Sequence, residues 1–213
     1  MCIRDRYKAI LPTVRRAGQK FSLGFKGEDQ WGNPSHRVEG TFVLRTNRAV
    51  EGLPASIEVH RGEFARRIDG LSVKALGELH VEVLDASGRV ACVSNPLRIV
   101  ANATLLPYWA DLHGQSEETI GTNSARELIE FARDRAFLDA MSHQGNDFQI
   151  TTPFWEELNR LTAEYSRDGA FVVFPGYEWS GNTGLGATAT CFSCTRAGRS
   201  TARITRSSRI SPM

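Results

Sequence analysis

The sequence predicts an antiparallel β-sandwich of immunoglobulin-like type, at residues 7–103, followed by an α/β domain at residues 104–186. Two observations predict this fold class. From about Gln19 to Val100, apolar and polar residues alternate in short runs separated by turn signals, whereas strand-like and helix-like patterns alternate after Tyr108. The chain has 213 residues, 41% of them hydrophobic, so it is long enough to bury a sizeable core.

The β-rich region is predicted from its period of two. Phe21, Leu23 and Phe25 alternate, as do Leu79, Val81 and Val83, so each set is expected on one face of a sheet. Shorter strands are expected at 41–44, 57–59 and 90–93, with turns at 32–34, 69–70 and 87–88. His36, His60 and His80 are not clustered with acidic residues or cysteines, and we interpret them as surface or strand residues. Cys92 is interpreted as a small buried hydrophobe.

Three strand–helix units are predicted in the second region. Strands are expected at 105–112, 137–141 and 171–174. Ser124 to Glu127 is typical of a capping box that opens a helix, whose apolar face we assign to Leu128, Phe131 and Ala132. Thr152 and Pro153 are predicted to begin a second helix that Gly169 closes. Its apolar face comprises Phe154, Leu158, Leu161 and Tyr165.

The two ends differ in character from the middle of the chain. Residues 1–6 are interpreted as an assembly scar, so Met1 need not be a true start and the compartment stays open. Residues 187–213 carry five arginines, no acidic residue and no periodicity, and a reading-frame slip after Gly186 is our hypothesis for this tail. The formal charge is +5 in the tail and +1 in residues 1–6, which leaves −4 for residues 7–186 out of the total of +2.

This composition argues against several classes of protein. The excess of positive charge lies mainly in a tail with little aromatic content, which speaks against nucleic-acid binding. No apolar run approaches the ~18 residues of a membrane span. Four cysteines are too few and too scattered for a disulfide framework, and Cys191 and Cys194 form a solitary Cys-x-x-Cys inside the tail. The oligomeric state stays open.

Residues that could bind a metal follow each predicted strand of the α/β region. Asp111, His113 and Gln115 follow the first strand, His143 the second and Glu178 the third. Successive strand ends meet on one side of a parallel α/β fold, and imidazole and carboxylate groups are ligands for divalent transition metals. Taken singly, these residues could instead be caps, turn residues or solvated charges, as could Asp147.

Three ordered motifs carry a family resemblance. They are YWADLHGQS at 108–116, MSHQGNDF at 141–148 and FPGYEWS at 174–180, with DQWGNP at 29–34 in the β-rich region. The first resembles a motif of the PHP (polymerase and histidinol phosphatase) superfamily. Together they are similar to the bacterial domain-of-unknown-function family 3604, and the similarity covers nearly all of residues 7–186.

The resemblance implies a metal-dependent hydrolase. It implies a (β/α) barrel of PHP type, of which this chain holds the first units, and a cluster of two or three divalent metal ions (zinc, manganese or iron). His113, His143 and Glu178 match metal ligands, Gln115 stands where the superfamily has a second histidine, and Ser142 stands where it often has aspartate. Glu178 and Asp111 are the candidate catalytic residues, with Asp111 as an orienting group or ligand.

The sequence therefore leaves two hypotheses for the function. In the first, the full-length parent hydrolyses a small-molecule substrate such as a phosphoester, and this chain is an inactive fragment because an incomplete barrel leaves ligands and a sheet edge unpaired. In the alternative, the β-sandwich is a non-enzymatic binding module and the α/β part is a remnant.

Overall fold

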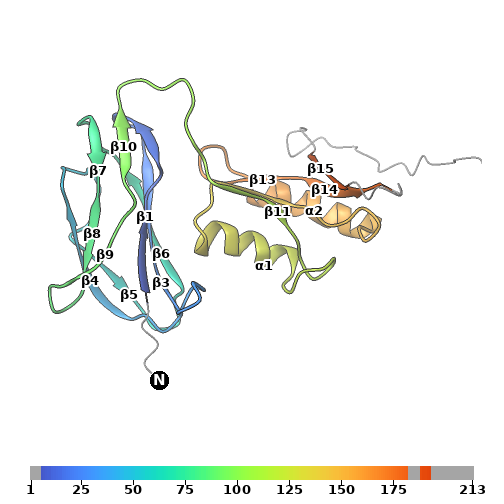
Figure 1. Cartoon of the computed structure of the whole chain (residues 1–213), viewed down its shortest axis with the longest axis horizontal. Coiled ribbons are helices and arrows are strands. Elements are labelled where there is room, and N and C mark those ends of the chain that lie inside the picture. The colour runs from blue at the N-terminus through green and yellow to red at the C-terminus, as the bar shows by residue number, and fades with distance from the viewer. Residues whose placement is uncertain (1–5, 182–187, 193–213) are drawn as a thin grey trace, which may run out of the picture. The chain divides into compact units, whose positions relative to one another are not determined.

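The computed structural model describes residues 6–181 and 188–192, which are rich in β-strands and contain few helical residues (Figure 1). The chain divides into two compact units. One comprises the residues up to Asp111 together with Glu127–Met141, and the other comprises Leu112–Arg126 together with the residues from Ser142 on.

Three sheets make up most of the first unit. Their strand orders are β1-β3-β6, β2-β10-β7 and β5-β4-β8-β9. The strands are β1 (Arg6–Ile10), β2 (Val14–Arg16), β3 (Phe21–Glu28), β4 (Gly40–Thr46), β5 (Ser56–Val59), β6 (Ala65–Leu71), β7 (Gly77–Leu79), β8 (Val81–Leu84), β9 (Val90–Val93) and β10 (Leu97–Val100). Arg6, which the sequence assigned to a scar, pairs with Glu28 as the first residue of β1.

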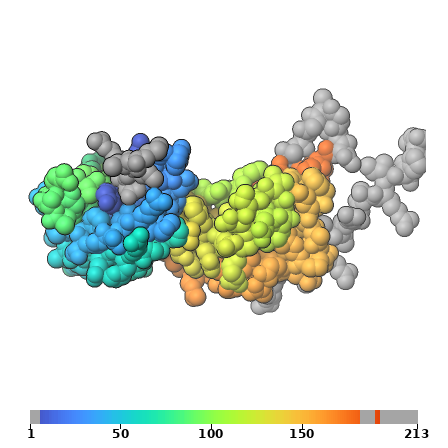
Figure 2. Space-filling model, turned by 90° about the horizontal axis from the view of Figure 1, so that it is seen from below, coloured from blue at the N-terminus to red at the C-terminus, as the bar shows by residue number. Residues whose placement is uncertain are grey.

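One apolar core joins these sheets. The Phe25 ring of β3 lies 4.9 Å from the Phe42 ring of β4, and the Tyr7 ring of β1 lies 5.3 Å from Phe42. Sheets β1-β3-β6 and β5-β4-β8-β9 therefore face each other across the core, as the predicted alternation requires. Figure 2 shows the blue-to-green residues of these sheets closely packed on the face in view.

The predicted strand through Leu79, Val81 and Val83 is two strands. β7 pairs with β10, whereas β8 pairs with β4, and the chain changes sheet at His80. The His80 backbone N–H donates to Asn47 Oδ1 (2.9 Å) at this change. The alternation continues unbroken because Leu79, Val81 and Val83 all face the same core from different sheets.

The α/β region contains β11 (Ala110–Gly114), α1 (Ala125–Glu130), a π-helical turn η1 (Phe131–Arg135), β12 (Ala140–His143), α2 (Thr152–Tyr165), β13 (Val172–Phe174), β14 (Gly176–Ser180) and β15 (Thr188–Phe192). Strands β11, β12 and β13 form one sheet in that order, with α2 connecting β12 to its neighbour β13, and β14 pairs with β15. None of the helices in the described residues is long and apolar enough to span a membrane.

Two predicted strands lie too early in the sequence. The strand expected at 105–112 is β11 at 110–114, and Pro107 explains the shift, because a proline has no N–H to pair within a sheet. The strand expected at 137–141 is β12 at 140–143, and Phe137 has a φ of 57°, which a strand does not accommodate. Asp111 and His113 thus lie within a strand rather than after it.

Both helices begin near their predicted starts, but α2 ends at Tyr165 and not at the predicted Gly169, and the buried faces differ slightly. Thr151 caps α2 by accepting from the Phe154 N–H (3.3 Å), and Pro153 sits in the first turn. Leu158, Leu161 and Tyr165 are buried as expected, but Trp155 is buried in place of Phe154. In the first helix Ala125, Ile129 and Ala132 are buried at ordinary helical spacing, whereas the predicted Phe131 is exposed.

A strand forms where the sequence predicted no regular structure. Residues 188–192 are β15, which pairs antiparallel with β14. Cys194 and the rest of the tail lie outside the described residues, as do residues 1–5.

The shared core yields a stability prediction. We expect Phe25→Ala to lower the free energy of unfolding by about 3–5 kcal/mol, because it leaves a cavity between two sheets. Val43→Ala, on the outer face of β4, should change it by no more than ~0.5 kcal/mol. Urea unfolding followed by fluorescence measures both, and equal losses would contradict a core centred on Phe25.

Candidate metal centre

Glu178 lies in β14, where its backbone is paired on both sides. The Glu178 N–H donates to Gly145 O (2.9 Å), and the Asp147 N–H donates to Glu178 O (2.8 Å). On the other side Glu178 pairs with Thr190 of β15. Asp147 Oδ1 also accepts from the Ser180 N–H (3.2 Å), which agrees with the interpretation of Asp147 as a turn residue. Glu178 therefore follows β13, as predicted, and lies within a further strand, β14, that the sequence did not predict.

The Glu178 carboxylate lies between two of the predicted ligands. Its Oε2 is 3.5 Å from His113 Nε2 and accepts from Gln115 Nε2 at 3.4 Å. The Glu178 side chain is 13% exposed, whereas the His113 side chain is 57% exposed. Thr190 Oγ1 lies 3.4 Å from His113 Nδ1, so both ring nitrogens of His113 have a polar neighbour. The structure thus brings together His113, Gln115 and Glu178.

Gln115 has a buried oxygen that the surrounding protein does not satisfy. Within residues 6–181 and 188–192, Gln115 Oε1 has no hydrogen-bond donor. The backbone turns back over this residue because Gly121, whose N–H donates to Ser116 O (2.8 Å), has no side chain to collide with Gln115 O. A buried acceptor without a donor costs about 1–3 kcal/mol, and a bound cation would satisfy it.

His143 is buried and neutral. The Gly145 N–H donates to its Nδ1 (3.1 Å) and the Ser116 N–H donates to its Nε2 (3.2 Å), which also lies 2.7 Å from Ser116 Oγ. Burial lowers the pKa of His143 from 6.5 to about 4, against the opposing effect of Glu118. The hydrogen bonds of His143 lead to Ser116 and Gly145, and a metal at Nε2 would have to replace the contact with Ser116.

Asp111 lies two residues before His113 in β11. Residues two apart in a strand share a face, so Asp111 is placed on the face that carries His113. Its side chain is exposed. Its orienting or ligand role stays a prediction.

Three supporting residues, Ser116, Gln144 and Thr190, were not found by sequence reasoning. Ser116 and Thr190 contact the two histidines, and Ser142 and Gln144 form a buried pair in which Gln144 Nε2 donates to Ser142 Oγ (2.6 Å). Ser142 in turn donates to Phe174 O (2.8 Å). A side chain at Gly176 would collide with Gln144 Nε2, so glycine in the third motif is the one signal that could have revealed this contact.

The donor set contains both nitrogen and oxygen. In the part of the chain that the structure describes, no group of three or more His, Cys, Asp or Glu side chains is placed to hold a metal ion. The third candidate ligand beside His113 and Glu178 is the amide of Gln115, whose unsatisfied oxygen adds a neutral donor atom to the imidazole and the carboxylate. Comparison with protein-family models and with curated proteins found no match.

The buried imidazole predicts acid sensitivity. His143 takes up a proton near pH 6.5 when unfolded but only near pH 4 when folded, so its contribution is complete above pH 6.5 and is lost as the pH falls toward 4. We expect this residue to lower the free energy of unfolding by about 3 kcal/mol across that window. Urea unfolding at about pH 7.5, 5.5 and 4 measures the loss, and His143→Gln should show a flatter profile. An unchanged profile in His143→Gln would assign the acid sensitivity to other groups.

Proposed function

We propose that this chain carries part of the active site of a metal-dependent hydrolase of PHP type, with an immunoglobulin-like sandwich followed by the first units of the barrel. The observation that carries the proposal is the Glu178 carboxylate between His113 Nε2 and the Gln115 amide, beside the unsatisfied Gln115 oxygen. The motifs that supply these residues are those of the family resemblance described above.

Each residue has a defined role in this proposal. Glu178 supplies a carboxylate that can bridge two metals, His113 supplies Nε2 and Gln115 supplies Oε1. His143 is a further ligand once Nε2 gives up its contact with Ser116, and Asp111 orients the substrate or a ligand. When bound, zinc, manganese or iron ions would activate water and neutralise charge on the group being transferred. We propose a small-molecule phosphoester as the substrate.

Metal titration tests this proposal. We expect Zn²⁺ or Mn²⁺ to bind the purified protein stoichiometrically in calorimetry. His113→Ala and Glu178→Gln should each weaken binding by at least about tenfold, because each removes a donor atom from the centre.

A matched control separates a site from a surface contact. His60 is 60% exposed and lies 3.8 Å from Glu58, much as His113 lies near Glu178. His60→Ala should leave metal binding unchanged. Absence of binding by the wild type, or equal weakening in His60→Ala and His113→Ala, would refute the proposal.

The alternative binding-module function has one supporting observation in the first unit. Trp31 is 73% exposed at a turn in which Asp29 Oδ1 accepts from the N–H groups of Trp31 and Asn33 (both 2.9 Å). An exposed indole held by an ordered turn can contact a sugar ring at little entropic cost.

Polysaccharide binding tests this alternative. If it holds, insoluble cellulose, chitin or xylan should deplete the full chain from solution. Trp31→Ala should abolish this depletion, whereas Trp179→Ala, which removes another exposed indole, should not. Failure of all three polysaccharides to retain the wild type would count against a glycan-binding role.

A further inference from the structure

Strands β11 and β12 are joined at their starts by a pair of residues that belong to the first unit. Trp109 precedes β11 and Asp139 precedes β12. Trp109 O accepts from the N–H groups of Asp139 (2.8 Å) and Ala140 (3.2 Å), while the Trp109 N–H donates to Asp139 Oδ2 (2.8 Å). Backbone and side chain of Asp139 thus both bind Trp109.

The same register is kept at the other end of these strands. Gly114 O accepts from the Gln144 N–H (2.7 Å), and the separation in sequence is thirty residues both there and at Trp109 and Asp139. A constant separation means that the strands run parallel. His113 and His143, each four residues beyond the pair, therefore lie at the same level of neighbouring strands.

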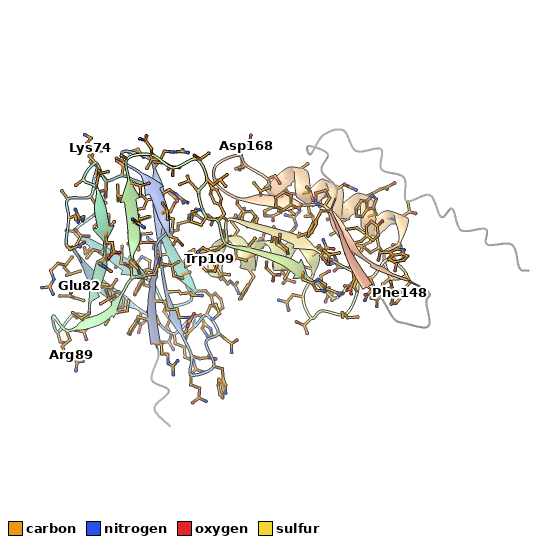
Figure 3. The ribbon with its side chains drawn as sticks, turned by 45° about the horizontal axis from the view of Figure 1, so that its top comes forward. Lys74, Glu82, Arg89, Trp109, Phe148 and Asp168 are labelled. Carbon is orange, nitrogen blue, oxygen red and sulfur yellow. The ribbon has the colours of Figure 1, made fainter. Side chains whose placement is uncertain are left out.

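Two residues of the β-sandwich hold this pair. Trp109 Nε1 donates to Thr13 Oγ1 (3.1 Å), and a guanidinium nitrogen of Arg15 lies 4.0 Å from Asp139 Oδ1. The Arg15 side chain is only 9% exposed, and its Cζ lies 5.3 Å from the centre of the Tyr108 ring. A charge this deeply buried needs a partner, and Asp139 supplies it. Figure 3 labels Trp109 where the chain enters β11.

A second set of contacts fixes the segment before β12 on the same sandwich. The Phe137 ring lies against Gly24 of β3, where an added Cβ would be 2.7 Å from it. The Arg135 Cζ lies 3.9 Å from the centre of the Phe64 ring. Phe137 has a positive φ, and such a conformation persists only where the surroundings determine it.

We propose that Thr13, Arg15, Trp109 and Asp139 form a register clamp: they are positioning residues through which the β-sandwich fixes β11 against β12. A slip of one residue would turn His113 to the opposite face of the sheet and separate it from Glu178. The sandwich would then act on the site through the register of β11 and β12. The consequence for metal binding rests on the proposed function, whereas the fixing of the strands does not.

Hydrogen exchange tests the clamp without any metal. We expect Asp139→Ala to speed exchange at residues 110–114 and 140–143 by at least about tenfold, with residues 21–28 unchanged, because it removes a hydrogen bond and leaves Arg15 unpaired. Asp139→Asn keeps an acceptor for the Trp109 N–H and should restore part of the protection. Thr13→Val should speed exchange in the same two segments by about threefold or more, and Thr41→Val, on the exposed face of β4, should not.

Histidine side-chain NMR supplies an independent measurement. The ring signals of His113 and His143 should shift in Thr13→Val, while those of His36 and His60 stay in place. Unchanged exchange at 110–114 and 140–143 in both variants, or faster exchange spread equally over 21–28, would overturn the clamp. If Asp139→Ala does not fold, the exchange and NMR measurements on Thr13→Val decide whether the clamp exists.

Metal binding separates this inference from the proposed function. In a wild type that binds Mn²⁺, Asp139→Ala should bind it at least about tenfold more weakly. A wild type that binds no metal would refute the proposed function, and the exchange and NMR results would still decide the clamp.

Discussion

The backbone of Gly145 connects the candidate ligands His143 and Glu178, because its N–H and its carbonyl each bind one of them. Its N–H donates to His143 Nδ1, and its carbonyl accepts from the N–H of Glu178. A Cβ at this position would lie 2.9 Å from the His143 ring and closer still to Thr119, so glycine is required by close approach. One small residue thus contacts the imidazole of His143 through its N–H and holds the backbone of Glu178 through its carbonyl.

The polar character of β12 follows from this arrangement. Ser142, His143 and Gln144 are all almost completely buried, although three consecutive residues of a strand alternate between its faces. Ser142 donates to Phe174 O, Gln144 donates to Ser142, and His143 contacts Ser116, so each uses a partner from its own surroundings. Burial also lowers the pKa of His143, because a charged imidazole would lose its hydration there.

Sequence reasoning predicted elements whose signal is local and missed those that depend on distant partners. The alternation of Phe21, Leu23 and Phe25 identified β3, and Pro153 after a threonine identified the start of α2. The change of sheet at His80 does not interrupt the alternation, so the sequence did not reveal it. The backbone pairing of Glu178 depends on Gly145, which is distant in the sequence, and on Thr190, which lies in a tail without a recognisable pattern. The nearness of His113 to Glu178 was predicted from their positions relative to strands, although both lie within strands. Ser116 and Thr190 were missed because a hydroxyl reaches a histidine only through tertiary contact.

Gln115 stands where the proposed superfamily has a histidine, and the described residues satisfy its amide only in part. As placed, its nitrogen donates to Glu178 and its oxygen finds no donor among the described residues. Turned by 180°, the oxygen would face the Glu178 carboxylate and the two would repel each other. Neither orientation satisfies both atoms with protein groups alone. A cation held by the Glu178 carboxylate and the Gln115 oxygen would remove this repulsion, and His113 would be the nitrogen ligand of the proposed centre. The unsatisfied oxygen of Gln115 therefore supports the proposed cation centre only together with the neighbouring Glu178 and His113, since Gln144 Oε1 also has no donor among the described residues.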